Sequence, residues 1–95
     1  MELRHVKIFV LAAEYQNFSK VAAFAFISQS SVSKYIQILE DELGGALFVR
    51  DGRHTELSEF GRAFLPHAIS ILEKEEEAKA VLQHFKQGYR HENLR

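Results

Sequence analysis

The chain has no cysteine, no tryptophan, one proline and one methionine among its 95 residues. Without cysteine it can form neither a disulfide nor a thiolate metal site, which suits a cytoplasmic protein. No run of apolar residues approaches the roughly 18 that a membrane-spanning helix needs. The first ten residues, MELRHVKIFV, carry charges at Glu2, Arg4 and Lys7, unlike a secretory signal. We therefore expect a soluble cytoplasmic protein that does not enter a membrane.

An excess of charge of either sign is also missing. The chain has 12 basic and 13 acidic side chains, and both kinds are spread evenly along it. Bulk charge alone therefore gives no support to nucleic-acid binding. With 46% apolar and 26% charged residues, the composition is typical of one globular domain with a small core.

Motifs of catalysis and of cofactor or metal binding are absent as well. No nucleophile stands with a base and an orienting acid in a recognisable motif, and no glycine-rich loop could hold a phosphate. The histidines lack the spacing of metal ligands; they are His5, His54, His67, His84 and His91. We expect no enzyme, no cofactor and no metal, and we interpret the histidines as structural or solvated.

The apolar residues present at the N-terminus follow helical spacing. Their repeat at three and four residues predicts a first helix from Glu2 to Tyr15, which ends where Asn17 can adopt a left-handed conformation. Ser19 can then cap a short second helix over Lys20 to Ala25. The two helices are therefore expected to meet across a tight turn.

The stretch ISQSSVSKYIQILEDELG, residues 27 to 44, reads as a third helix with two unlike faces. Ser28 is the expected N-cap, and Gly44 is the expected end. Ile27 and Val32 are placed to form a hydrophobic staple across that cap. One face is apolar, with Val32, Ile36, Leu39 and Leu43, and the other carries short hydrogen-bonding side chains and a lysine.

Two short segments follow, ALFVR and RHTEL, around Asp51-Gly52. Asp-Gly is one of the strongest signals for a two-residue hairpin, so we predict a two-strand β-wing with Arg50 and Arg53 at its tip. After the wing, Ser58 is a good N-cap for a long helix that we expect to end at Gly88. Such a helix would be about 45 Å long at ~1.5 Å per residue.

The long helix carries an apolar pattern of four and three residues, the spacing of a two-helix coiled coil. Glu75 is the one charged position in it. The helix is too long to bury this pattern within a monomer of 95 residues, so we predict a homodimer. The alternative is that the first pattern residues, such as Phe64 and Leu65, cover the domain's own core. The predicted dimerisation residues are Phe64, Ala68, Ile71, Leu72, Ala78, Leu82 and Phe85.

Three helices and a hairpin in this order describe a mainly α fold, a winged helix-turn-helix, followed by a long dimerisation helix. In that fold the third helix enters the DNA major groove, and short side chains let the backbone approach closely. The predicted base or major-groove contacts are Gln29, Ser30, Ser33, Lys34 and Gln37, with Gln29 and Lys34 as first choices for direct readout. The predicted backbone and wing contacts are Ser19, Lys20, Ser31, Arg50 and Arg53.

The motifs NFSKVAA, SQSSVSKYIQILEDELGGALFVR and LSEFGRAFLPHA occur in the order and spacing of the LysR-type bacterial transcriptional regulators, which the chain resembles. The resemblance implies a DNA-binding domain over residues 1–57, a linker helix over 58–88 that pairs two subunits, and a hinge over 89–95. It implies a partly palindromic promoter site read by a homodimer. It also implies tetramers in a longer parent protein, whose missing C-terminal domain would sense a small-molecule effector.

Some positions depart from the family pattern. Phe24 and Phe26 stand where polar residues are usual, so either the second helix is rotated to bury their rings or they form an exposed patch. Glu56 lies on the wing where a basic residue is frequent, which favours a weaker grip on DNA. A winged helix that binds only protein, without direct DNA contact, is the alternative function.

Overall fold

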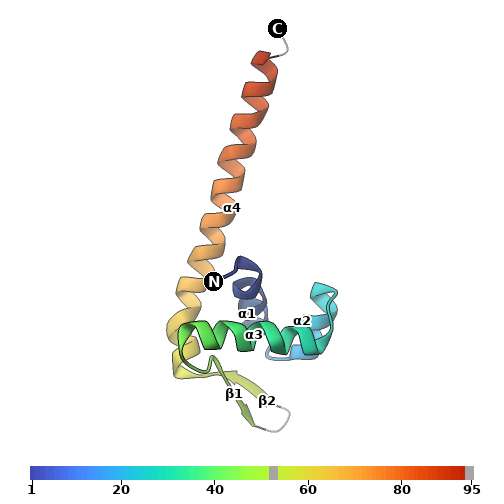
Figure 1. Cartoon of the computed structure of the whole chain (residues 1–95), viewed down its shortest axis with the longest axis vertical. Coiled ribbons are helices and arrows are strands. Elements are labelled where there is room, and N and C mark those ends of the chain that lie inside the picture. The colour runs from blue at the N-terminus through green and yellow to red at the C-terminus, as the bar shows by residue number, and fades with distance from the viewer. Residues whose placement is uncertain (52–53, 94–95) are drawn as a thin grey trace.

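The structure is a computed structural model that describes residues 1–51 and 54–93, with side chains up to residue 87. Three helices form a compact body with a two-strand wing, and a fourth helix leaves that body as a long stalk (Figure 1). The molecule measures 63 × 26 × 19 Å. The elements are α1 (Leu3–Tyr15), α2 (Phe18–Ala25), α3 (Gln29–Leu43), β1 (Phe48–Asp51), β2 (His54–Leu57) and α4 (Glu59–Asn93). This order of elements confirms the predicted winged helix-turn-helix with a long fourth helix.

The core lies where the apolar faces of the helices meet the base of the wing. Phe9 of α1 is at its centre, with ring centres 5.6 Å from Phe48 of β1 and 5.2 Å from Phe64 of α4. The apolar face of α3 is buried as its spacing predicts. The largest fully buried side chains are Phe9, Ile36, Leu39, Leu47, Val6, Val21 and Val32. No helix in the part of the chain that is described is long and apolar enough to cross a membrane.

The junction of α1 and α2 differs from the prediction. Gln16, not Asn17, adopts the left-handed conformation that ends α1, with φ 54°. Asn17 instead caps α2, because its side-chain oxygen accepts a hydrogen bond from the Lys20 amide at 3.0 Å. The prediction of Ser19 as the cap is therefore wrong. The earlier cap brings Phe18 into the helix, where its ring is buried edge-on against Phe48 at 5.7 Å.

The ends of α3 are those the sequence predicts. The Ser28 hydroxyl accepts a hydrogen bond from the Ser31 amide at 3.1 Å. Gly44 closes the helix with φ 85°, a conformation that glycine adopts at little cost. Beyond it, the Glu40 carboxylate accepts the Leu47 amide at 2.7 Å, which ties the end of α3 to the approach to the wing.

The wing is an antiparallel pair in which Phe48 lies opposite Leu57 and Asp51 lies opposite His54. Asp51 is thus the last residue of β1, and its prediction as a turn residue is wrong. Gly52 lies outside the described residues. Phe48 enters the core at the base of the wing, and Asp51 with His54 forms the last pair of the ladder.

The start of α4 is locked against the start of the wing. The Ser58 hydroxyl accepts the Gly61 amide at 2.9 Å and donates to the Ala46 carbonyl at 2.5 Å. Gly61 is required here, because a Cβ at this position would lie 2.1 Å from the Leu47 carbonyl oxygen. Ser58 therefore caps α4, as predicted, and these contacts fix the direction in which the helix begins.

The first third of α4 packs on the core of its own chain. Ala68 has no exposed surface, and Phe64, Leu65 and Leu72 pack against the same core. The alternative in which the early pattern residues cover the domain is confirmed, and Ala68 is excluded as a dimer contact. The predicted end at Gly88 is also wrong, because α4 runs on to Asn93 through most of the segment predicted as a hinge. A glycine costs a helix only about 1 kcal/mol and keeps its amide hydrogen bond.

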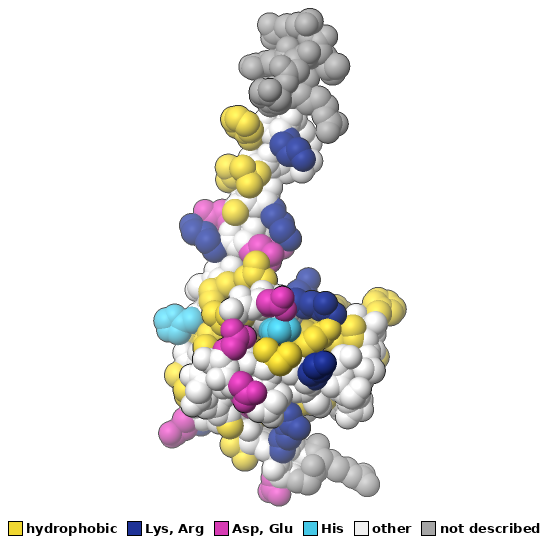
Figure 2. All heavy atoms as spheres, in the orientation of Figure 1, with side chains coloured by type: hydrophobic (Ala, Val, Ile, Leu, Met, Phe, Trp, Pro, Cys, Tyr) yellow, Lys and Arg dark blue, Asp and Glu magenta, His cyan; other side chains and the backbone are white. Residues whose placement is uncertain are grey.

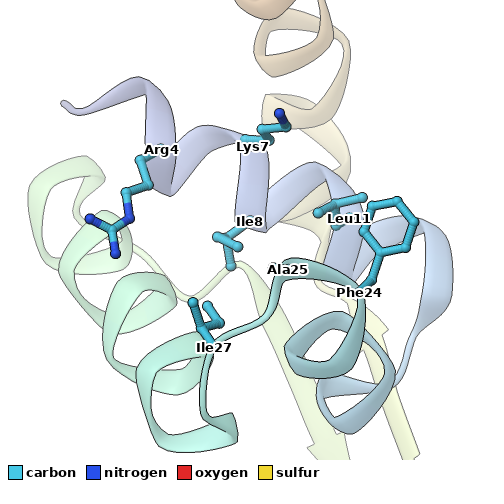
Figure 3. A pocket seen from close by; sticks show the side chains of 7 residues that line it. All are labelled: Arg4, Lys7, Ile8, Leu11, Phe24, Ala25 and Ile27. Atoms are coloured by element: carbon cyan, nitrogen blue, oxygen red, sulfur yellow. The ribbon is translucent and has the colours of Figure 1, made fainter.

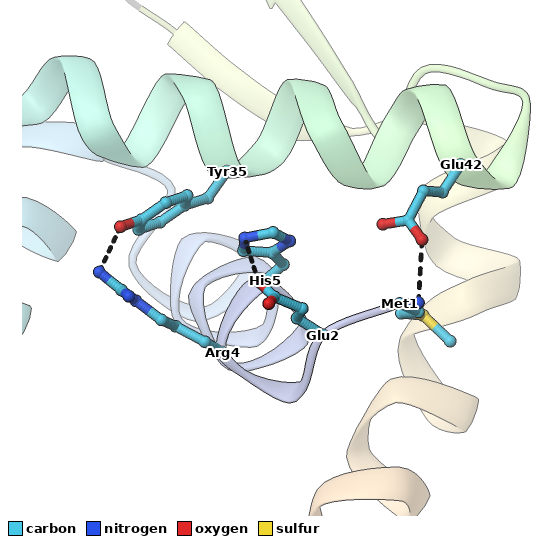
Figure 4. A network of polar contacts seen from close by, with 6 residues as sticks. All are labelled: Met1, Glu2, Arg4, His5, Tyr35 and Glu42. Carbon is cyan, nitrogen blue, oxygen red and sulfur yellow. Dashed lines mark hydrogen bonds and ion pairs between the residues drawn. The ribbon is translucent and has the colours of Figure 1, made fainter.

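Side chains of α1 bind it to α3 (Figure 4). The Arg4 guanidinium donates to the Tyr35 hydroxyl and lies 4.7 Å from that ring's centre. His5 is buried, stacks on Tyr35 at 4.9 Å and approaches the Glu2 carboxylate at 3.1 Å. The N-terminal amine pairs with Glu42 at 2.9 Å. His5 is therefore a structural residue.

Candidate nucleic-acid interface

The outward face of α3 presents the side chains predicted to contact bases. Four of them are exposed and Ser33 is half-buried, on the side opposite the buried Val32, Ile36 and Leu39. Residues four positions apart lie on the same face of a helix, so Gln29, Ser33 and Gln37 form one row along α3. The full set is Gln29, Ser30, Ser33, Lys34 and Gln37. The helix therefore offers a continuous polar surface that begins at its N-terminus.

A polar recess of about 370 Å³ lies where the starts of α2 and α3 meet the wing. It brings together Ser19, Gln29, Ser33 and Arg50, which the sequence predicts as contacts, from positions far apart in the chain. Sequence reasoning missed Asn17, Phe18 and Thr55, which complete the lining. The sequence signal for Asn17 and Phe18 is the Asn-Phe-Ser run, in which Asn17 caps α2 and Phe18 anchors it; nothing local in the sequence points to Thr55.

Arg50 lies beside this recess and not at the tip of the wing. It stands in β1 opposite Thr55, with its guanidinium 4.6 Å from the centre of the Phe18 ring. Its predicted place at the tip is therefore wrong, because the hairpin extends beyond it. A guanidinium over an aromatic face is oriented but remains charged, so it still has N–H groups for an anion. Arg53, the second predicted wing cation, lies outside the described residues.

Hydroxyl groups gather at the start of α3. Ser28 lies 3.0 Å from the Ser30 hydroxyl and donates to that of Ser31 at 2.8 Å. Lys34 lies one turn further along the helix, and Lys20 lies on α2; both are exposed. Neither lysine forms an ion pair with any residue that the structure describes. Both are thus available to an anionic partner.

Two contacts constrain individual predicted residues. Ser19 donates to the side-chain oxygen of Gln29 at 2.8 Å, so the two helix starts are joined by side chains. Gln37 donates to the Asp41 carboxylate at 2.9 Å, which places an acidic group on the same face of α3. On the wing, Glu56 is paired with His54 at 3.1 Å.

Phe24 and Phe26 are exposed, with 59% and 94% of their surface accessible. Of the two alternatives, the exposed patch is therefore the one observed, while Val21 and Ala22 form the buried side of α2. Phe24 borders an apolar groove of about 270 Å³ between α1 and the α2–α3 turn (Figure 3). Arg4 and Lys7 lie at its edge. None of the predicted DNA-contact residues lines this groove.

The stalk of α4 carries an exposed apolar stripe (Figure 2). Val81, Leu82 and Phe85 are 63%, 60% and 67% exposed, and Ala78 lies on the same side one turn earlier. Charged residues of the stalk pair within the helix, as Lys79 does with Glu75 at 3.5 Å. Among the described residues, no three histidine or acidic side chains form a potential metal site.

Comparisons with known proteins identify this arrangement. Residues 3–62 match the family model of the bacterial regulatory helix-turn-helix proteins, lysR family. The chain is 42% identical over 89 residues to the transcriptional regulator CitR of Bacillus subtilis, covering 94% of this chain and 31% of CitR. It is 44% identical over 79 residues to the hca operon activator HcaR of Escherichia coli, covering 83% of this chain and 27% of HcaR. The chain thus spans less than a third of these relatives.

Solved structures agree with the sequence comparison. The BenM_DBD/benA site 1 DNA complex is similar with a TM-score of 0.84 at 35% identity, over 90% of this chain and 99% of that one. Full-length CbnR complexed with its target DNA is similar with a TM-score of 0.82 at 35% identity, over 87% of this chain and 29% of that one.

Proposed function

Because the chain belongs to the LysR family of bacterial regulatory helix-turn-helix proteins, we propose that it is a sequence-specific DNA-binding module of a transcription regulator. The observation that carries this proposal is the polar face of α3, which continues into the recess beside Arg50. Promoter DNA in the cytoplasm is the partner. A net charge of −1 does not oppose this, because the cations that matter are placed locally.

In the proposed complex α3 lies in the major groove. Gln29 and Lys34 reach base edges near the helix start, and Ser30, Ser33 and Gln37 line the approach to the bases. Lys20, Ser31, Arg50 and Arg53 hold phosphates on either side, and these contacts fix the register without reading sequence. Lysine offers a point charge where arginine would offer a planar fork, which favours a single contact from Lys34.

We propose further that two copies assemble through the stalk. Ile71, Ala78, Leu82 and Phe85 form the pairing surface, because Phe64, Ala68 and Leu72 already pack on their own domain. A homodimer can read two half-sites of a partly palindromic promoter site about 34 Å apart, one helical turn of DNA. In a longer parent protein, sensing of a small-molecule effector and assembly to a tetramer belong outside residues 1–95, with 89–95 as the connection.

The direct test is a gel shift of the purified chain on promoter DNA with excess non-specific competitor. The proposal predicts a retarded complex that unlabelled promoter DNA displaces and random DNA of equal length does not. Footprinting of that complex should show protection of two half-sites in successive major grooves. A chain that is folded and dimeric but gives no retarded complex would support the alternative function, a winged helix that binds only protein.

A further inference from the structure

The hydrogen bond between Ser19 and Gln29 joins the two helices of the helix-turn-helix at the surface proposed to face DNA. The Ser19 hydroxyl donates to Oε1 of Gln29 at 2.8 Å. A serine hydroxyl has one proton to give, so in this arrangement Ser19 has none left for a phosphate oxygen. Because of this contact, Ser19 has a different role from the residues proposed to hold the DNA backbone.

Both ends of this bond are held in place by other contacts. On the side of α2, Asn17 caps the helix through the Lys20 amide at 3.0 Å. Phe18 is buried edge-on against Phe48 and lies beneath the Arg50 guanidinium. On the side of α3, the Ser28 cap fixes the helix start one residue before Gln29. Ser19 thus acts from a rigid position.

The bond decides which part of the Gln29 carboxamide remains available. With Oε1 directed to α2, the Nε2 amino group with its two N–H donors is left to contact a base. A bidentate contact with adenine needs both ends of the carboxamide outward, since Oε1 must accept from adenine N6 while Nε2 donates to N7. A contact through Nε2 alone needs only an acceptor, which adenine and guanine offer at N7 and thymine at O4, whereas cytosine presents only a donor.

From this geometry we propose that Ser19 is a positioning residue that restricts Gln29 to donating from Nε2 to a base acceptor such as purine N7. This inference rests on the proposed DNA-binding function and adds a specificity rule to it. At the position read by Gln29, the chain accepts bases that present an acceptor in the major groove and rejects cytosine, which presents only a donor. Loss of the Ser19 hydroxyl releases Oε1, permits the bidentate contact and shifts the preference toward adenine.

The test uses operator duplexes selected from a random pool, and the position read by Gln29 is the one whose base preference disappears in Gln29→Ala. A duplex with adenine there is compared with duplexes carrying 7-deazaadenine, which lacks N7, or purine, which lacks the N6 amino group. The wild-type chain should lose about 2- to 10-fold in affinity with 7-deazaadenine, the effect of one hydrogen bond. With purine its affinity should stay within about twofold.

Ser19→Ala should become sensitive to both analogues and should prefer adenine over guanine, whereas Ser19→Thr, which keeps the hydroxyl, should behave like the wild type. A merely structural role for Ser19 would lower affinity for every duplex alike. The inference is overturned if Ser19→Ala keeps the wild-type analogue pattern, or if the wild type is equally sensitive to both analogues or selects cytosine. It is also overturned if Gln29→Ala changes no base preference, although DNA binding itself would then stand. Failure of the wild type to bind any selected duplex would instead refute the proposed function.

Discussion

Arg50 of the wing and Phe18 of α2 are in direct contact, with the guanidinium 4.6 Å from the ring centre. This contact joins a strand to a helix through two residues that lie 32 positions apart in the chain. It holds a positive charge at the edge of the recess that Gln29 and Ser33 also line. The wing and the helix-turn-helix are therefore parts of one surface.

Arg50→Ala should weaken binding to operator and random DNA alike, because the proposed contact is to phosphate. The slope of log affinity against log salt concentration should fall by roughly 1. Lys86→Ala, which removes a cation from the exposed stalk, is the matched control and should leave the slope unchanged. An unaltered slope in Arg50→Ala would mean that the guanidinium only packs on Phe18.

Asp41→Asn should increase affinity for DNA of any sequence. The Asp41 carboxylate accepts from Gln37 on the face of α3 proposed to approach DNA, so it repels phosphates. Removing one exposed charge should raise affinity by a few-fold at low salt, and the gain should shrink as salt screens it. Glu14→Gln, at the exposed end of α1, is the control. Equal affinities of Asp41→Asn and wild type at low salt would place Asp41 away from the DNA.

Gly61→Ala should destabilise the domain by about 1–3 kcal/mol, the usual cost of overpacking. The new Cβ would lie 2.1 Å from the Leu47 carbonyl oxygen, and neither backbone segment can move without disturbing the Ser58 cap. The free energy of unfolding in urea measures the effect. Ser70→Ala, at an exposed position of the same helix, should change it little. A Gly61→Ala variant as stable as wild type would show that α4 can shift on the wing.

Leu82→Glu should convert the proposed homodimer to a monomer while keeping the helix content measured by circular dichroism. Leu82 is 60% exposed on the apolar stripe of the stalk, where a charge would have to be buried against the second copy of the proposed dimer. Ala80→Glu adds the same charge on the opposite side of the helix and should remain dimeric. Light scattering distinguishes the two. A dimeric Leu82→Glu variant would place the interface elsewhere.

The two ends and the buried face of α3 could be predicted from the sequence, because the signals for them are local. The apolar spacing, the Ser28 cap and the Gly44 stop all lie within the helix and agree with one another. The α1–α2 junction could not be predicted in the same way. Asn17 and Ser19 are both good N-caps, and the choice depends on Phe18 reaching Phe48, a contact between residues thirty apart.

Two further errors also concern relations between distant segments. The Asp-Gly pair predicts a turn that would put Arg50 at the wing tip, whereas Asp51 still belongs to the strand and pairs with His54. The apolar pattern of α4 predicts that its side chains are buried. It does not predict whether the same chain or a second copy buries them. The structure shows that its first part, around Ala68, is buried in the same chain, while the stripe at Leu82 stays exposed.

Whether the face of α3 reads DNA sequence is decided by comparing two proteins on two duplexes. Wild type and Lys34→Ala are titrated on operator DNA and on a scrambled duplex of the same composition at one salt concentration. We expect Lys34→Ala to lose about 1–3 kcal/mol of binding free energy on the operator and clearly less on the scrambled duplex. Equal losses on both duplexes would contradict it, since Lys34 would then contact only the backbone.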